Sequence, residues 1–364
     1  MKSIEIQSRD HCYRVLIAGN LLEQTGPLIR SICTNARCAV ITDNTVASLF
    51  AEKTLASLRA AGFAPVLIPI AAGESAKSMA QAEAVCEAMS AAGLDRTSFL
   101  VALGGGVVGD LAGFVAAIYF RGIPFVSIPT TLLAQVDSCI GGKTGVNSAA
   151  GKNSIGRFHP PALVIADTDT LRTLPRKIWN EGFAEIIKHG IIRDPDLFAR
   201  VENGARFRLA DDANWSRDLA WLIERNLTIK AEIVSKDERE KTGTRSLLNF
   251  GHTVGHAIEF AANYRNILHG EAISLGIVAA AEVSVQRAGL SLGEAERIKA
   301  ALHARGLPIA LPVDFPRGKI LEALPRDKKF EDGQVRFVVA HAIGRASIAT
   351  DVTMEDLRLA VETL

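Results

Sequence analysis

Residues 98–120, SFLVALGGGVVGDLAGFVAAIYF, decide the fold of this chain. They begin with an apolar run of strand length, turn through three consecutive glycines and continue as a pattern typical of a buried helix. Gly104, Gly106 and Gly109 satisfy the G-x-G-x-x-G pattern in the strand–turn–helix context that dinucleotide binding requires. Such glycines let the backbone approach a pyrophosphate, which then meets the exposed amides of the helix N-terminus.

The glycine turn also has a purely structural explanation. A ribose-binding acid belongs about twenty residues further on, but after Asp110 the next acid is Asp137. A tight turn with close packing of the following helix would need the same glycines. The turn by itself therefore favours dinucleotide binding only slightly.

The alternation of strand and helix extends on both sides of this stretch. Further apolar runs of strand length are YRVLIAG (13–19), RCAVITD (37–43), APVLIPI (64–70), PFVSIP (124–129) and ALVIAD (162–167). Between them, residues 48–62 and 78–93 have helical periodicity and end in glycine. Strands that alternate with helices predict a largely parallel sheet covered on both faces, hence an α/β, Rossmann-like N-terminal domain.

From about Trp179 onward the pattern becomes mostly helical. Long amphipathic segments cover 213–240, 271–289 and 292–305, a hairpin is expected at 335–349, and a final helix at 351–363. We therefore predict an α/β domain over residues 1–178 and a mainly α-helical domain over residues 179–364, which suits a chain of 364 residues.

Composition narrows the functional class. The chain is 48% hydrophobic and 22% charged, with a formal net charge of +1, so charge gives no reason to expect nucleic acid or a membrane surface as partner. Its five cysteines are scattered and form no C-x-x-C, which argues against a disulfide framework or a thiolate metal site. Neither a signal sequence nor an apolar run of membrane-spanning length is evident. We expect a cytoplasmic protein.

A group of polar side chains inside an otherwise apolar segment lies in RSLLNFGHTVGHAIEFAANYRNILHGE, residues 245–271. His252 and His256 are four residues apart at an expected helix start, so both imidazoles project from one face, and His269 follows. Two histidines at this spacing with a third nearby suit a divalent metal, most simply zinc. Helix capping or core hydrogen bonding explains the pair about equally well, but Arg245 and Asn249 in an otherwise apolar segment favour a site.

A second set of ligands for the same metal site would include Glu185. It stands three residues before Lys188 in EGFAEIIKHG, where an exposed ion pair is the simpler explanation. Glu185 is also the best carboxylate to join His252 and His269, because three protein ligands with an open position are typical of catalytic zinc. His256 would then serve in hydrogen bonding or proton transfer. The spacing does not choose between the two ligand sets.

A basic and polar loop covers residues 128–160, at the end of the strand expected at 124–129. Its polar residues lie among glycines: Thr130, Thr131, Asp137, Lys143, Asn147, Lys152 and Asn153. Glycines between lysines predict a flexible, amide-rich concavity suited to an anion. A solvated surface loop is the alternative, but the position after a buried strand is where parallel sheets bind ligands.

Taken together, the motifs closely resemble the 3-dehydroquinate synthase family of the sugar phosphate cyclases. They are, in chain order, GGGVVGDLAGF, RGIPF, PTTLLAQVDSCIGGKTGVN, GKNSIGRFH, GFAEIIKHG, KDERE, RSLLNFGHTVGHAIEF and LHGEA. The resemblance as a whole runs from about residue 10 to beyond the DKK at 327–329. The resemblance implies a Rossmann-like and an α-helical domain with the site in the cleft, NAD and zinc or cobalt as cofactors, and a homodimer. It also implies conversion of 3-deoxy-D-arabino-heptulosonate 7-phosphate to 3-dehydroquinate and phosphate, through oxidation by NAD, elimination, reduction, ring opening and aldol closure.

The resemblance further implies site residues. The metal ligands would be Glu185, His252 and His269. The NAD contacts would be Glu74, Lys77, Gly105, Gly106, Val107, Val108, Gly109, Asp110, Thr130, Thr131, Lys143, Lys152, Thr170, Leu171, Arg172 and Thr173. The substrate's carboxylate would meet Lys143, Lys230 and Arg245, and its phosphate end Asn153, Lys188, Asn249, His256 and the second subunit's Arg121. Asp137 and one of Lys328 or Lys329 would complete the catalytic set with Glu185.

Three rival functions are compatible with parts of this pattern. A sister cyclase would act on a substrate without a carboxylate, but Arg245, Asn249, His256 and the DKK lysines argue against it. A polyol dehydrogenase of the same architecture would release NADH instead of recycling it. A non-catalytic nucleotide- or metal-binding protein would not need such complete charged constellations.

Overall fold

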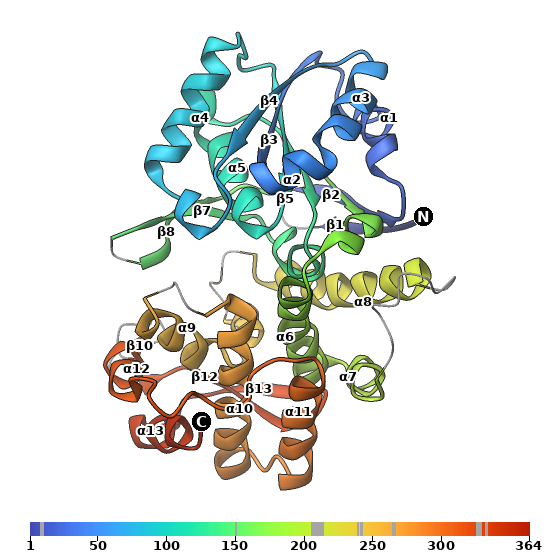
Figure 1. Cartoon of the computed structure of the whole chain (residues 1–364). Helices are drawn as coiled ribbons and strands as arrows, with labels where there is room; N and C mark the ends of the chain where they lie inside the picture. The colour runs from blue at the N-terminus through green and yellow to red at the C-terminus, as the bar shows by residue number, and fades with distance from the viewer. Residues whose placement is uncertain are drawn as a thin grey trace. The chain divides into compact units, whose positions relative to one another are not determined.

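The computed structural model describes residues 1–7, 11–149, 151–204, 215–238, 240, 243–263, 267–324, 330–331 and 334–364 (Figure 1). Its internal contacts divide the chain into two compact units. Unit 1 is Met1–Leu174 with Arg208–Ala231, and unit 2 is Pro175–Phe207 with Glu232–Leu364. Most of helix α8 (Trp215–Lys236) thus groups with unit 1.

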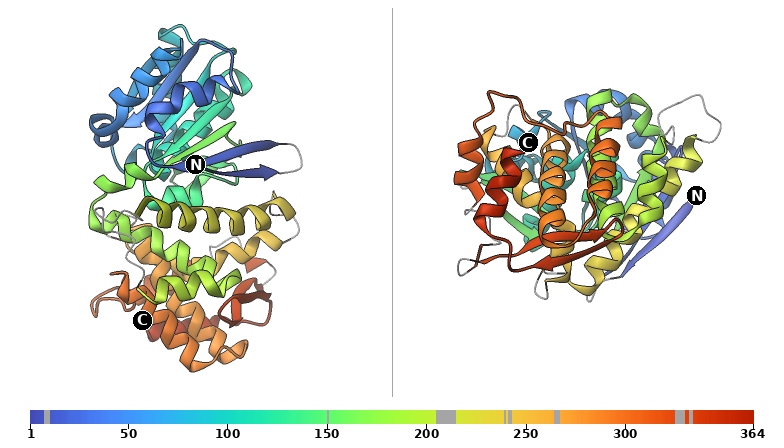
Figure 2. Two further views of the ribbon diagram at one scale, coloured as in Figure 1. Left: turned by 90° about the vertical axis from the view of Figure 1, so that its right-hand side faces the viewer. Right: turned by 90° about the horizontal axis from the view of Figure 1, so that it is seen from below.

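Unit 1 is built on a seven-stranded sheet with the order β1-β2-β9-β6-β5-β3-β4. Its strands are β1 (Lys2–Gln7), β2 (Cys12–Ala18), β3 (Arg37–Asp43), β4 (Ala64–Ile70), β5 (Phe99–Gly104), β6 (Phe125–Pro129) and β9 (Leu163–Asp167). The six strands expected from the sequence are confirmed and pair in parallel. Strand β1 was not expected; it pairs antiparallel with β2 at the edge of the sheet (Figure 2).

Helices cover both faces of this sheet, as predicted. Along β3, Val40 belongs to the apolar core under helices α1 (Thr25–Arg30) and α3 (Glu52–Ala60). The next residue, Ile41, belongs to the opposite core, under α4 (Met79–Ala91) and α5 (Gly106–Ile118). Successive side chains of a strand point to opposite faces, and both faces are buried here, so the strands read as continuous apolar runs.

Short helical turns connect these elements. They are η1 (Leu22–Gln24), α2 (Asn44–Val46), η2 (Ala47–Ala51), η3 (Glu74–Ala76), η4 (Tyr119–Arg121), η5 (Ala134–Ser138) and η6 (Thr168–Thr173). The crossover after β3 runs through α3 to β4 on one side, whereas the crossover after β5 runs through α5 to β6 on the other. The direction in which successive strands are added to the sheet therefore reverses between β3 and β5. Open α/β sheets bind nucleotides at the carboxyl ends of the strands at such a point.

The expectation of a flexible loop over 128–160 is wrong in its second part. That part forms an antiparallel hairpin of β7 (Lys143–Ser148) and β8 (Gly151–Phe158). Gly145 faces Gly156 across the hairpin, and a Cβ on Gly156 would lie 2.3 Å from the Thr144 carbonyl oxygen. The glycines thus allow a close approach of two strands, and their abundance did not signal flexibility.

Unit 2 is mainly helical. Its helices are α6 (Arg176–Arg193), α7 (Pro195–Glu202), η7 (Thr244–Asn249), α9 (His252–Ala261), α10 (His269–Arg287), α11 (Leu292–Ala304), α12 (Arg317–Ala323) and α13 (Met354–Glu362). Its strand pairs are β10 (Phe330–Glu331) with β11 (Gln334–Val335), and β12 (Phe337–Ala342) with β13 (Arg345–Ala349). The predicted late helices and the hairpin at 335–349 are confirmed, with α10 beginning two residues before its predicted start. Among the described residues, every helix is too short or too polar to cross a lipid bilayer.

Candidate active site

Glycines set the distances between three helices of unit 2. A Cβ on Gly270, the second residue of α10, would lie 2.5 Å from the Glu181 carbonyl oxygen of α6. A Cβ on Gly276 would lie 2.0 Å from the carbonyl oxygen of Gly251, the residue that precedes α9. Only a hydrogen fits at either position. The N-terminus of α10 therefore packs directly on α6, and the start of α9 packs directly on α10.

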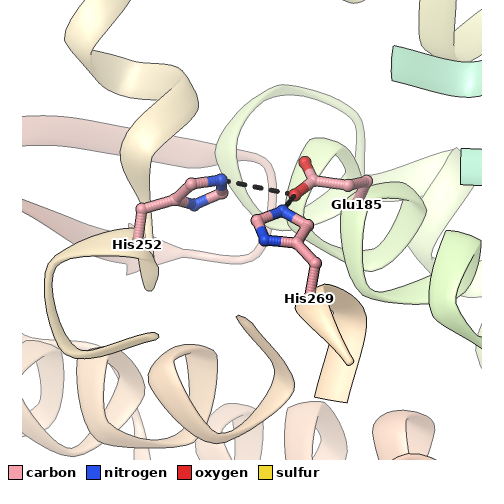
Figure 3. Close-up of side chains that lie close together, drawn as sticks. All are labelled: Glu185, His252 and His269. Carbon is pink, nitrogen blue, oxygen red and sulfur yellow. Dashed lines mark ion pairs between the residues drawn. The ribbon is translucent and has the colours of Figure 1, made fainter. Parts of the chain in front are cut away.

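This packing brings a carboxylate of α6 to the first residues of α9 and α10 (Figure 3). His252 Nε2 lies 3.3 Å and His269 Nε2 lies 3.6 Å from the same Glu185 oxygen, Oε1. Tetrahedral zinc with bonds of about 2.1 Å separates its ligand atoms by about 3.4 Å, so both distances fit a shared ion. The Lys188 ammonium pairs with Oε2 of Glu185, so Oε1 is the oxygen that faces both imidazoles and would meet the ion.

A second possible ligand set shares one of these histidines. His256, Glu259 and His269 also offer atoms within 4.8 Å of one another. His256 is exposed, whereas Glu185 is only 1% exposed, so the Glu185 set is the more enclosed of the two. Sequence reasoning missed Glu259, although its position seven residues after His252, two helical turns along the same face, was a usable signal.

Lys188 does not form the exposed ion pair that its spacing suggested. Its ammonium pairs with Glu185, and the two side chains are only 2% and 1% exposed. Burial raises the pKa of Glu185, but Lys188 and then His252 outweigh it and hold the pKa well below the ordinary value. Glu185 is therefore an anion at neutral pH, as a metal ligand must be.

The two histidines differ in protonation. Burial lowers the pKa of His252 and keeps its imidazole neutral. Burial also opposes the charged form of His269, but the nearby carboxylates of Glu185 and Glu259 outweigh it and raise the pKa to about 10. In the metal-free protein His269 thus carries a proton between two carboxylates, and a divalent ion would replace that proton.

The other predicted residues of unit 2 lie on η7 and α9. Arg245 is 3% exposed; its Nη1 donates to the Glu238 carbonyl oxygen at 2.6 Å, and its Nε lies 3.7 Å from Glu240 Oε1. Asn249 ends η7 and is half-buried. The ring of His256 lies 5.3 Å from that of His252. Lys328 and Lys329 lie outside the described residues.

Most of the predicted NAD contacts follow the carboxyl ends of parallel strands in unit 1. Glu74 and Lys77 follow β4, residues 105–110 follow β5, Thr130 and Thr131 follow β6, and residues 170–173 follow β9. Because carboxyl ends of parallel strands meet at one edge of a sheet, these residues gather along that edge. Lys143 and Lys152 lie instead on the β7–β8 hairpin.

Several features of this edge fit a nucleotide. Helix α5 begins after Gly105 without a side-chain cap, so its first amides are available to a phosphate. A pocket beside them is lined by Gly104, Gly105, Asp110 and Lys143. Within the described residues, Thr130 Oγ1 is buried without a hydrogen-bond partner. A buried orphan hydroxyl is costly in the absence of a ligand, which makes Thr130 a good candidate contact.

Two of these candidates are already engaged with each other. Lys77 pairs with Asp110, and the Lys77 side chain is only 5% exposed. Burial also raises the pKa of Asp110, against the opposing effect of Lys77. Asn147 of β7 donates to Glu74 at 2.7 Å, which ties the hairpin to η3.

Among the predicted substrate residues of unit 1, Asp137 and Lys230 are brought together. Lys230 Nζ lies 2.8 Å from both Asp137 Oδ2 and the Asp137 carbonyl oxygen. Arg121 and Asn153 are exposed and have positive φ values of 71° and 51°. Lys143 is exposed as well.

Comparison with known proteins agrees with this architecture. Residues 67–181 match the family model for the 3-dehydroquinate synthase N-terminal domain, and residues 182–330 match that for the C-terminal domain. A 3-dehydroquinate synthase of Geobacter metallireducens is 44% identical over 98% of this chain and 97% of its own length. Among solved structures, 2-epi-5-epi-valiolone synthase from Streptomyces hygroscopicus, with NAD+ and Zn2+ bound, is 32% identical with a TM-score of 0.87 over 96% of each chain. A 2-deoxy-scyllo-inosose synthase, complexed with carbaglucose-6-phosphate, NAD+ and Co2+, is 24% identical over all of both chains with a TM-score of 0.86, and supports the fold alone. The chain belongs to the 3-dehydroquinate synthase family.

Proposed function

We propose that this chain converts 3-deoxy-D-arabino-heptulosonate 7-phosphate to 3-dehydroquinate and inorganic phosphate, a step of the shikimate pathway towards aromatic amino acids. The observation that carries the proposal is the convergence of Glu185, His252 and His269 in unit 2, in a chain 44% identical to a 3-dehydroquinate synthase over nearly its full length. The reaction makes it a carbon–oxygen lyase, because the phosphate leaves by elimination.

NAD and a divalent cation, zinc or cobalt, are the cofactors of this proposal. When bound, NAD would supply hydride transfer, and the cation would polarise the oxygen of the alcohol whose carbon gives up the hydride. Glu185, His252 and His269 would hold the cation, and the carboxyl edge of the unit 1 sheet would hold the nucleotide. The NAD+ and Zn2+ of the 32% identical valiolone synthase support this assignment, and cobalt suits the same oxygen and nitrogen ligands.

Charged side chains would bind the two ends of the substrate. We assign its carboxylate to Lys143, Lys230 and Arg245; the guanidinium of Arg245 can form two parallel hydrogen bonds to a carboxylate. Asp137 holds the ammonium of Lys230 in place at 2.8 Å, and the Glu238 carbonyl does the same for Arg245. Lysine and arginine side chains that are already held in place lose little conformational entropy when the substrate binds. Removing one such contact to a buried anion should weaken binding by about 2–5 kcal/mol.

The phosphate end would meet Asn153, Lys188, Asn249, His256 and Arg121. Lys188 is held beside Glu185, so its ammonium would lie near both the metal and the phosphate. The phosphate's own oxygens can serve as the base for elimination, and the exposed His256 is available to exchange a proton with solvent.

We further propose a homodimer in which the partner supplies Arg121. Ile118 and Phe120 beside it are 40% and 50% exposed, and Ile155 and Phe158 on strand β8 are 39% and 40% exposed. Large apolar side chains on a strand of a two-stranded hairpin favour burial against another chain. Light scattering would give twice the chain mass. Mixing inactive Arg121→Ala and Glu185→Gln proteins would restore at most about one quarter of the activity, because half of the dimers are mixed and each has one complete site.

The cytoplasm is the compartment we propose.

The sister-cyclase function is the second candidate, because the valiolone synthase is 32% identical over nearly the whole chain. The two functions differ in what the cationic residues bind. If they bind a carboxylate, a heptulose phosphate with a hydroxymethyl group in its place should turn over poorly, whereas a sister cyclase would prefer it.

One assay separates these functions. Phosphate release from 3-deoxy-D-arabino-heptulosonate 7-phosphate is measured with zinc and substoichiometric NAD, while absorbance reports NADH. Stoichiometric phosphate without accumulating NADH supports the proposed reaction. Accumulating NADH would indicate a dehydrogenase, turnover of only the carboxylate-free substrate would indicate the sister cyclase, and no turnover despite bound NAD and zinc would indicate a binding protein.

A further inference from the structure

We propose that Glu259 is a positioning residue that orients the imidazole of His269 for metal binding. Glu259 Oε1 lies 3.5 Å from Nδ1 of His269, while Nε2 of the same ring lies 3.6 Å from Glu185 Oε1. The ring thus sits between two carboxylates, one from α6 and one from α9. The inference rests on the proposed metal site, and it adds a residue that contacts no substrate and need not contact the ion.

The contact assigns the two nitrogens different tasks. A proton on Nδ1 is donated to Glu259, which leaves the Nε2 lone pair free and aimed at the ion beside Glu185. A carboxylate behind a metal-bound imidazole also fixes the rotation of the ring and strengthens the ligand as a donor. Without that acceptor the ring could rotate and place either nitrogen toward the ion.

The burial of Glu259 is the second observation. The side chain is 2% exposed and is preceded by Ala257 and Ile258, which are 4% and 0% exposed. A buried carboxylate destabilises the fold unless it is paired. An apolar residue would pack at this position without that cost, so the carboxylate indicates a polar task that packing does not supply.

The backbone of His269 is held by other groups. Glu181 accepts a hydrogen bond from Gly270 N at 3.3 Å, and Glu271 accepts one from Leu268 N at 2.9 Å. These bonds fix the residues on either side of His269 but leave its χ angles free. Ring orientation is therefore the property that Glu259 controls. Glu181 provides a matched control: this buried glutamate accepts from the backbone of Gly270, and within the described residues no hydrogen bond or ion pair joins it to the His269 ring.

Glu259→Gln and Glu181→Gln are compared with the unmodified full-length chain after removal of metal. Zinc affinity is measured by competition with a chelating dye, and the visible absorption of the cobalt-loaded protein reports ligand geometry. We expect Glu259→Gln to weaken zinc binding by about 10- to 100-fold and to change the cobalt spectrum, because a neutral amide is a weaker acceptor for the imidazole N–H than a carboxylate and its NH2 group can turn toward the ring instead. Glu181→Gln should keep the zinc affinity within about threefold and leave the cobalt spectrum unchanged, since its amide oxygen can still accept from Gly270 N. Thermal unfolding of each metal-free variant within a few degrees of the unmodified chain shows that the fold is retained.

Glu259→Gln with unchanged zinc affinity and an unchanged cobalt spectrum would overturn the inference. Equal losses in both variants would also overturn it, because they would mean that burial of charge, and not ring orientation, governs the site. If the unmodified chain failed to bind zinc, the proposed metal site itself would be wrong. That outcome is distinguishable from failure of the inference about Glu259, because it is seen without either variant. Glu259→Leu, which fills the volume without an acceptor, should bind zinc more weakly than Glu259→Gln.

Discussion

Adding one methyl group at Gly270 tests whether close helix packing builds the metal site. In Gly270→Ala the new Cβ would lie 2.5 Å from the Glu181 carbonyl oxygen and 2.6 Å from its Cα. Ordinary contact begins near 3.4 Å, so α10 must move away from α6 by about 1 Å. Both atoms belong to backbone, so no side-chain rotation can relieve the clash. We expect a loss of about 1–3 kcal/mol in the free energy of unfolding.

The same displacement reaches the metal ligand, because His269 is the neighbour of Gly270 and Glu185 stands one helical turn after Glu181. A shift of about 1 Å far exceeds the tolerance of about 0.2 Å in a metal–ligand distance. We therefore expect zinc affinity to fall by about 100-fold, as for the loss of one ligand's optimal placement.

Gly293→Ala is the matched control. Gly293 lies in α11 of the same unit, and a Cβ there would have nothing within 4 Å. An alanine in an open helical position should stabilise the protein by about 0.5–1 kcal/mol and leave zinc affinity unchanged. Denaturant unfolding of the metal-free proteins and zinc competition measure both quantities. If Gly270→Ala bound zinc within threefold of the unmodified chain, the close α6–α10 contact would not be what positions His269.

Three further outcomes are expected. Thr130→Val removes a buried hydroxyl that has no protein partner in the described residues, so the stability of the protein without metal and NAD should be unchanged or slightly higher. The affinity for NAD+, measured by calorimetry, should fall about fivefold, as for one lost hydrogen bond. At Asp356, burial raises the pKa, but hydrogen bonds from Arg287 and from the cap of α13 outweigh it and lower the pKa. This carboxylate therefore stabilises the fold at every pH above its unfolded-state pKa of about 4, and the stabilisation is lost as the pH falls through the lower folded-state pKa. Asp356→Asn should accordingly cost about 1 kcal/mol in urea unfolding at pH 7 and progressively less below pH 4; an equal cost at both would contradict the assignment. Burial raises the pKa of Cys38 and of Cys139 to about 12, so neither thiol should react with a disulfide reagent at pH 8 in the folded protein, whereas both should react in urea.

The sequence predicted the strands of unit 1 because a buried parallel strand is apolar on both faces. In β3 every residue from Cys38 to Thr42 is buried, and the run stands out in any window of the sequence. Strand β1 did not stand out, since only Ile6 of its six residues is buried and charged side chains interrupt it. The β7–β8 hairpin was missed for a different reason. Its glycines are required by backbone contact across the strands, and composition cannot distinguish that use from a mobile loop.

The candidate metal site was predictable only in part. Helical spacing indicated that His252 and His256 share a face, but it could not tell which histidine turns inward; that depends on where α10 packs, and the contact at Gly276 determines it. Burial likewise separates Glu185 from an ordinary surface ion pair, and burial is a property of tertiary packing. Glu259 was hidden for the same reason. Its spacing from His252 places it on the same helix face, but a glutamate near the end of an amphipathic helix normally faces water, and the contact with His269 forms only when α9 and α10 pack together.

The electrostatics of the site explain why unit 2 buries so many carboxylates. His252 and His269 are the first residues of α9 and α10, so two helix N-termini, each with a partial charge of about +0.5, point toward the site. Lys188 adds a full positive charge. A dication would be repelled by this arrangement if nothing offset it. Glu181 and Glu271 accept from the amides that flank His269 and so neutralise the α10 terminus directly, which leaves Glu185 and Glu259 to balance the ion and its imidazole ligand. The second group lies against the ligand atoms themselves, so it determines both the affinity for the ion and the direction in which those atoms point, whereas the first group acts on the backbone amides, where an amide oxygen can replace the carboxylate.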